Sequence, residues 1–106
     1  MSVTINDLLD QLAEDESRKS QIQIYFNTAS TWIKNAVTSD LKDNSFFDTE
    51  RAGPLMDTAI LSYSMELWTH RSETLPPSTA VGHMVGQLRG LYSSWKEEQD
   101  ETLQTQ

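Results

Sequence analysis

The sequence predicts an all-α fold, a small bundle of about four helices with a long loop between the second and third and a flexible C-terminal tail. Apolar residues recur at spacings of three and four along four segments, which is the period of a helix. Clusters of turn-forming residues separate these segments. Strand-like alternation is confined to the short run 21–25, which lies inside a helical pattern. The length of 106 residues fits one domain.

A short first helix is predicted over about residues 4–13. Thr4 precedes the apolar pattern and Asp7 follows three residues later, which is the spacing of a capping box with Asp in place of Glu. The apolar residues that share one face of this helix are Ile5, Leu8, Leu9 and Leu12.

The second helix has the strongest pattern and is predicted over about residues 16–38. Asp15 or Ser17 is expected to cap its start, where acidic residues also favour the helix dipole. The apolar stripe continues through four turns and consists of Ile22, Tyr25, Phe26, Ala29, Trp32, Ile33, Ala36 and Val37.

A long polar segment, residues 38–53, separates the second helix from the third. It is rich in turn formers and contains the aromatic pair Phe46 and Phe47. A connection of this length is unusual between helices of one compact domain. Either the aromatic pair anchors the loop to the core, or the loop makes contacts outside the subunit. Phe46 and Phe47 are therefore candidate interface residues.

The third helix is predicted to begin at Gly53–Pro54 and to end near Glu73. Proline is favoured at the first position of a helix, and the Pro76–Pro77 pair prevents the helix from continuing. This helix is apolar around much of its circumference, which predicts a central position in the bundle. Its apolar residues are Leu55, Met56, Ala59, Ile60, Leu61, Tyr63, Met65, Leu67 and Trp68.

The final helix is expected to start at Ser78 or Thr79 and carries three glycines at a spacing of four. Each glycine in a helix interior costs roughly 0.8–1 kcal/mol relative to alanine. Unless the spacing is accidental, either a neighbouring helix approaches this face closely, or the segment becomes ordered on assembly. Both explanations involve a partner, so the candidate interface residues include Gly82, Gly86 and Gly90.

The three tryptophans, residues 32, 68 and 95, lie at or near apolar stripes, which is typical of core packing. Aromatic anchors are also common at subunit interfaces. Trp95 is the best candidate for such an anchor because it is the last apolar residue before the polar end of the chain.

The formal net charge of -8 is concentrated at the two ends of the chain. Residues 1–16 hold five acids and no base, residues 96–106 hold four acids and one base, and residues 17–95 hold seven of each. The absence of a basic stripe argues against a nucleic-acid reader. We therefore divide the chain into a helical domain, 1–95, and an acidic flexible tail, 96–106. Two acids of that tail, Glu97 and Glu98, are candidate partner contacts.

The residue types required for catalysis do not form a recognisable pattern. Without cysteine, the chain has neither a thiolate metal site nor a Cys nucleophile. Glu66 and His70 have the spacing of two metal ligands, but no third ligand accompanies them, so an ordinary surface pair is the simpler interpretation. A phosphate-binding glycine loop and a nucleophile elbow are both absent from the sequence. We expect no enzymatic activity, no metal and no cofactor.

Four segments stand out in order along the chain, namely residues 4–9, 29–37, 66–73 and, after Pro76–Pro77, 84–89. Together they resemble the head–tail connector (adaptor) proteins of long-tailed bacteriophages. Residues 4–9, TINDLL, resemble the start of that family, and residues 29–37, ASTWIKNAV, resemble the end of its long helix. Residues 66–73, ELWTHRSE, are similar to its central helix. Pro76–Pro77 followed by residues 84–89, MVGQLR, resembles its closing element, although the glycine-rich final helix departs from the family pattern.

The resemblance implies a virion protein at the head–tail junction, assembled in the host cytoplasm. Such proteins form a ring, commonly of twelve copies, that joins the portal of the head to the head-closure or tail proteins. The partners are then other copies of the chain, the portal protein and the head-closure or tail-completion protein. DNA passes through the ring without sequence-specific binding, and no membrane is involved.

The alternative function is a small acidic helical binding module or a DNA-mimic regulator. A DNA mimic is expected to spread acids over its folded face, whereas residues 17–95 of this chain are neutral overall.

Overall fold

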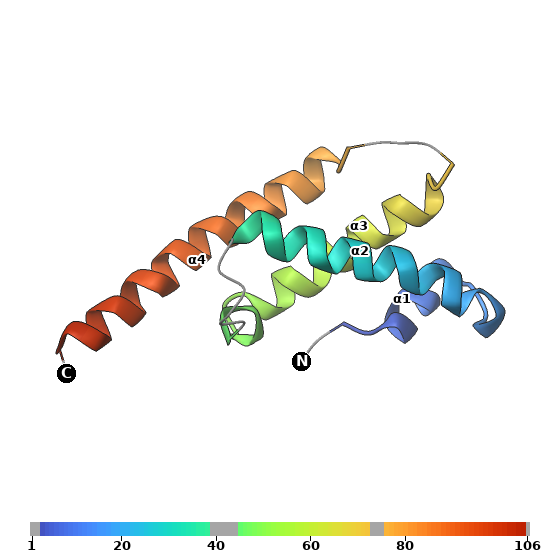
Figure 1. Cartoon of the computed structure of the whole chain (residues 1–106). Coiled ribbons are helices and arrows are strands. Elements are labelled where there is room, and N and C mark those ends of the chain that lie inside the picture. Colours follow the sequence, from blue (N-terminus) through green and yellow to red (C-terminus); the bar gives the residue numbers. More distant parts are fainter. Residues whose placement is uncertain (1–2, 39–44, 73–75, 106) are drawn as a thin grey trace.

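The computed structural model describes residues 3–38, 45–72 and 76–105, and the all-α prediction is confirmed (Figure 1). No strand occurs within these three ranges. The elements in chain order are α1 (Ile5–Leu12), the 3-10 helix η1 (Glu16–Arg18), α2 (Lys19–Val37), the 3-10 helix η2 (Ser45–Asp48), α3 (Gly53–Thr69) and α4 (Thr79–Thr105).

The start of α1 contains the predicted capping box. The Thr4 hydroxyl accepts a hydrogen bond from the Asp7 N–H at 3.3 Å, and the Asp7 carboxylate accepts one from the Thr4 N–H at 2.8 Å. The N–H of Val3 donates to Asp57 on α3 at 2.9 Å. These bonds satisfy backbone groups that a helix end leaves without partners, and they join the first turn to the bundle.

The predicted second helix consists of η1 followed by α2. Asp15 is the cap, and its carboxylate accepts a hydrogen bond from the Ser17 N–H at 3.0 Å and one from the Ser17 hydroxyl. Because these bonds favour the charged carboxylate, they hold the pKa of Asp15 below its ordinary value. The side chains of α2 that are buried in the core are Ile22, Phe26, Ala29, Ile33 and Val37.

The third helix ends at Thr69, earlier than the predicted end near Glu73. An Arg71 Nη1–H group donates to the carbonyl of Trp68 at 2.7 Å, and the guanidinium lies 3.9 Å from the centre of the Trp68 ring. The side chain thus occupies a carbonyl that a longer helix would use for its own backbone. Glu73 itself lies outside the described residues.

The turn from α3 to α4 is held by one carboxylate. Ser78 caps α4, because its hydroxyl oxygen accepts a hydrogen bond from the Val81 N–H at 3.2 Å. The carboxylate of Glu66 on α3 accepts hydrogen bonds from the Ser78 N–H at 3.0 Å and from its hydroxyl at 2.6 Å. The start of α4 is therefore positioned directly by α3.

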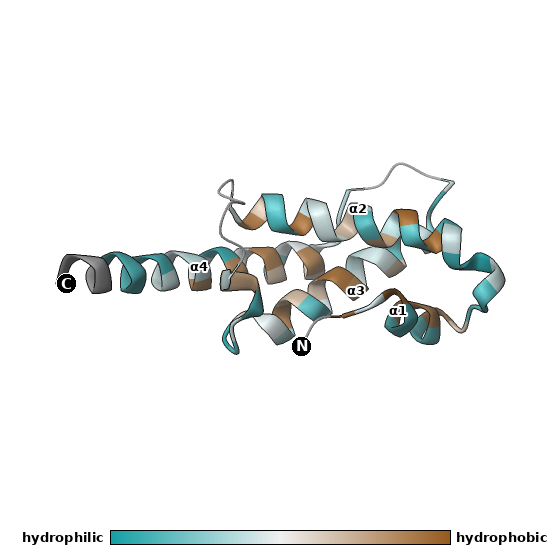
Figure 2. Ribbon diagram, turned by 60° about the horizontal axis from the view of Figure 1, so that its bottom comes forward, coloured by the Kyte–Doolittle hydropathy of each residue, from teal (hydrophilic) through white to brown (hydrophobic). Residues whose placement is uncertain are grey.

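The core lies where α2, α3 and the first part of α4 face one another, and α1 covers one end (Figure 2). The apolar residues gather in this region, whereas the end of α4 that projects beyond the bundle is mostly hydrophilic. The projection makes the molecule elongated, with extents of 53 × 25 × 19 Å. The largest fully buried apolar side chains are Phe46, Leu8, Ile22, Ile33, Leu88 and Val81.

The acidic tail predicted at residues 96–106 is a direct continuation of α4 as far as Thr105. The helix crosses the predicted boundary after Trp95 without interruption. All side chains from Lys96 to Asp100 are exposed. We refer below to residues 96–105 as the arm.

Candidate interaction surfaces

The aromatic pair of the long loop is anchored in the core. Phe46 is fully buried, and its ring lies 5.2 Å from that of Tyr92 and 5.6 Å from that of Trp95. Phe47 is also buried, and the Lys34 ammonium lies 5.8 Å from its ring centre. Of the two possibilities raised by the sequence, the described part of the loop thus fits the first, while residues 39–44 lie outside the described residues. Both rings are committed to packing within one chain.

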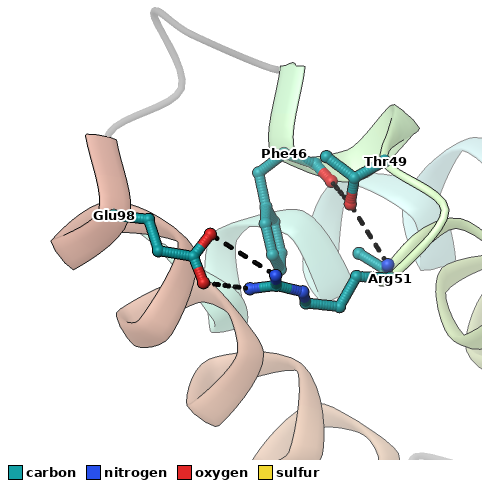
Figure 3. Close-up of polar contacts among 5 residues, drawn as sticks. Phe46, Thr49, Arg51 and Glu98 are labelled. Carbon is teal, nitrogen blue, oxygen red and sulfur yellow. Dashed lines mark hydrogen bonds and ion pairs between the residues drawn. The ribbon is translucent and has the colours of Figure 1, made fainter. Parts of the chain in front are cut away.

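The segment after Phe46 contacts α4 a second time, through an ion pair at the base of the arm (Figure 3). The Arg51 guanidinium and the Glu98 carboxylate approach with two nitrogen–oxygen distances of 3.2 and 3.4 Å. The Thr49 hydroxyl orders the adjacent turn by donating to the Phe46 carbonyl at 2.8 Å and accepting from the Ala52 N–H at 3.2 Å. Because both partners are largely exposed, this pair orients the arm more than it stabilises the fold.

Trp95 is half-buried, whereas the side chains that follow it, from Lys96 to Asp100, are exposed. Its ring lies against Phe46 and against Tyr92, with centroids 5.9 Å apart in the second pair. Glu97, the next predicted partner contact, is exposed. The predicted residues Trp95, Glu97 and Glu98 are therefore close together, at the point where α4 leaves the bundle.

The three glycines of α4 face outward. Gly82, Gly86 and Gly90 are all exposed, and a Cβ added to any of them would meet no atom within 4 Å. Among the described residues, no neighbouring helix of the same chain approaches this face. The described part of the chain thus leaves this face of α4 open.

The outer side of α2 carries two large exposed apolar side chains. The sequence did not identify Ile24 as an interface candidate, and it ranked Trp32 behind Trp95. Ile24 is 64% exposed and Trp32 is 38% exposed, whereas Trp68 is buried. One side of the Trp32 ring is supported by the buried Tyr63, with ring centroids 5.1 Å apart. One feature of the sequence could have predicted that Ile24 is exposed. It lies away from the apolar stripe of α2, whereas a core residue of this helix would continue that stripe.

Tyr63 lies at the junction of this surface with the core. Burial raises the pKa of its phenol, and the negative charge of Glu66 raises it further. Both effects disfavour the tyrosinate form.

Among the described residues, the titratable side chains offer no candidate metal site. No group of three or more His, Cys, Asp or Glu side chains converges there. Glu66, one of the two candidate ligands, is engaged with Ser78. A shallow groove of about 300 Å³ runs along α3, lined by Ser62, Met65, Glu66, Thr69 and His70. Four of these residues lie on α3 and His70 follows it directly, so the described lining of the groove comes from one segment of the chain.

No helix within the described ranges combines the length and the apolar character needed to cross a bilayer. Comparisons of the chain with protein-family models, with curated proteins and with solved structures found no match. The interpretation of these surfaces therefore depends on their geometry and charge.

Proposed function

We propose that this protein is a structural assembly protein that forms a ring, commonly of twelve copies, at the head–tail junction of a phage. The ring joins the portal to the head-closure or tail proteins and leaves a channel for DNA. This specific identity derives from the resemblance of four sequence segments to the head–tail connector family.

The arm is the feature of the structure that best supports an assembly role. Because the arm continues α4, it needs no new nucleus, but most helical stability in proteins comes from tertiary packing of a helix face. The described side chains of the arm, residues 96–100, are exposed, and Glu98 forms an ion pair with Arg51 at the base of the arm. A helix of this kind gains stability when another molecule covers it.

The charge of the chain supports the same function. Its net charge of -8 gives a surface that repels the phosphate backbone, which suits a channel through which DNA slides without binding. The acids of the arm, which include Glu97, Glu98 and Asp100, suit a basic surface on the portal or on a tail protein.

The alternative, an acidic binding module or DNA mimic, is favoured by the same exposed acids of the arm. The distribution of the remaining acids weighs against it. No acid lies between Glu16 and Asp40, nor between Glu73 and Glu97, so most of α2 and α4 lacks the charges that a DNA mimic requires.

The test is binding to purified portal rings, followed by size-exclusion chromatography with light scattering. We expect the full-length chain to join the rings in multiple copies and a variant lacking residues 96–106 to bind at least tenfold more weakly. A full-length double variant, Glu97→Gln with Glu98→Gln, separates the effect of charge from that of length. A chain that stays monomeric and never joins portal rings contradicts the proposal, whereas undiminished binding of the truncated variant removes the arm from the portal contact.

A further inference from the structure

The outward side of α2 is uncharged over almost its whole length. From Ser20 to Ile33 the sequence contains no charged residue, in a chain with 16 acids and 8 bases. Surface helices usually place charges on the face opposite their apolar stripe, whereas the centres of interfaces are depleted of charge. We name this surface the α2 strip, and its exposed residues are Ile24, Thr28, Thr31, Trp32 and Asn35.

Part of the polar surface on and beside the α2 strip is already hydrogen-bonded within the helix. The Thr28 hydroxyl donates to the Ile24 carbonyl at 2.9 Å, so one polar group of the strip already has a partner within the helix. On its border, the Gln23 amide donates to the Asn27 side-chain oxygen at 2.9 Å. Burying polar groups that keep their hydrogen bonds avoids most of the desolvation cost.

Trp32 has the properties of an interface anchor. Its ring packs against that of Tyr63 and is still 38% exposed, so it needs little ordering when a partner binds. Fixed aromatic side chains of this kind dominate binding energies at protein interfaces. Together with Ile24, it gives the strip an apolar surface that projects from the helix.

The distribution of acidic residues indicates which molecule binds the α2 strip. A strongly acidic chain repels other copies of itself except where neither copy presents acids. The second acid-free region is the outer surface of α4 between Thr79 and Ser94, on the side away from the buried Val85 and Leu88. The Arg89 guanidinium on this surface donates to the Ala36 carbonyl at 2.6 Å, at the end of α2. The exposed residues there include Gly82, His83, Gly86, Gln87 and Gly90.

We infer that the α2 strip binds a second copy of this chain, through the outer surface of α4 between residues 79 and 94. This inference rests on the proposed ring and names the surfaces that join neighbouring copies. The two surfaces also have complementary shapes, because Ile24 and Trp32 project from one helix and the glycines of the other carry no side chains. Since the paired surfaces differ, a pair of copies leaves the α4 surface of one copy and the α2 strip of the other free. Further copies can therefore add, which produces a closed ring or an open filament.

The size of the contact predicts that it is weak when taken singly. The 19 residues of α2 form a helix about 28 Å long and about 10 Å wide, which presents on the order of 300 Å². Stable interfaces bury about 800 Å² on each partner. An isolated pair should therefore dissociate readily, whereas each copy in a closed ring is held by two neighbours.

The first experiment measures self-association of the full-length chain by sedimentation velocity over a wide concentration range. Ile24→Glu places a carboxylate in the strip at a side chain that is 64% exposed, so the fold should be retained, as circular dichroism can verify. Gln11→Glu is the matched control, because it adds the same charge at an exposed position of α1. We expect Ile24→Glu to weaken association at least tenfold and Gln11→Glu to leave it unchanged.

The second experiment uses the absence of cysteine from the sequence to cross-link at chosen sites. Thr31→Cys and Gln87→Cys are prepared as separate variants, mixed, and treated with a short bifunctional thiol reagent, alone and on portal rings. The inferred contact predicts links between 31 and 87 in excess of the 31–31 and 87–87 links. Association that Ile24→Glu leaves unchanged, or links mainly of the 31–31 kind, overturns the contact and leaves the ring proposal standing. A wild-type chain that stays monomeric with and without portal rings overturns both.

Discussion

At the scale of single residues, Ser78 joins two helices through one hydroxyl group. It caps α4 and gives Glu66 a hydrogen-bond partner, so Ser78→Ala removes the cap and one partner of a carboxylate. We expect the free energy of unfolding to fall by about 1–2 kcal/mol, measured by urea denaturation. Ser93→Ala, at an exposed position of the same helix, should change it by less than about 0.5 kcal/mol. Equal effects of the two substitutions would contradict the role of Ser78 as a cap.

Tyr63 gives the fold a dependence on alkaline pH. Its pKa lies above the ordinary value of 10.0 because of burial and the nearby Glu66 charge, so the folded state holds the phenol proton more tightly than the unfolded state. This stability is fully present below the ordinary pKa and is lost as pH rises through the raised pKa of the folded protein. Tyr63→Phe keeps the ring beside Trp32, and we expect it to flatten the alkaline loss of stability. Denaturation curves from about pH 8 to pH 11 test this, and an unchanged slope would contradict it.

At the scale of elements, η2 acts as a packed part of the core. Phe46→Ala removes a fully buried ring that contacts Tyr92 and Trp95, and we expect a loss of about 3–5 kcal/mol. That is a large share of the stability of a small domain. Phe46→Leu retains most of the apolar volume and should lose less, which keeps the measurement possible if the alanine variant does not fold. Ile24→Ala should change stability by less than about 0.5 kcal/mol, and a similar loss in Ile24→Ala and Phe46→Ala would contradict the packing role.

The elements that could be predicted from the sequence are those determined by local chemistry. The Thr4–Asp7 capping box, the Asp15 cap and the Ser78 cap each depend on neighbouring residues, and each occurs in the structure. The end of α3 was predicted too late because Arg71 folds back onto Trp68, a contact that hydrophobic periodicity does not contain.

The candidate surfaces depend on tertiary packing, so the sequence left alternatives open. The apolar character of Phe46 and Phe47 fits a core contact and an interface equally, and only the burial of both rings in the folded chain distinguishes the two possibilities. The glycine spacing identified one face of α4. Whether a helix of the same chain covers that face depends on the tertiary fold, which the spacing does not contain.

At the scale of the whole molecule, the arm determines the dimensions. A compact domain of this length has a radius of gyration of about 13 Å, whereas the Cα atoms of this chain give 15.3 Å. Removing residues 96–106 should therefore lower the radius measured by small-angle X-ray scattering by about 2 Å. Full-length protein that already scatters as a compact sphere would show that the arm folds back in solution.

The position of Lys96 makes the arm accessible to a simple chemical probe. It is the last Lys or Arg of the sequence, and it lies exposed where α4 leaves the bundle. Trypsin can therefore remove the acids beyond it by cutting a single peptide bond, provided that the helix opens there. Because cleavage requires local opening, the rate of this cut reports how often the arm unwinds. A bound partner that stabilises the arm would protect this bond, so a digestion series alone would show which molecule covers it.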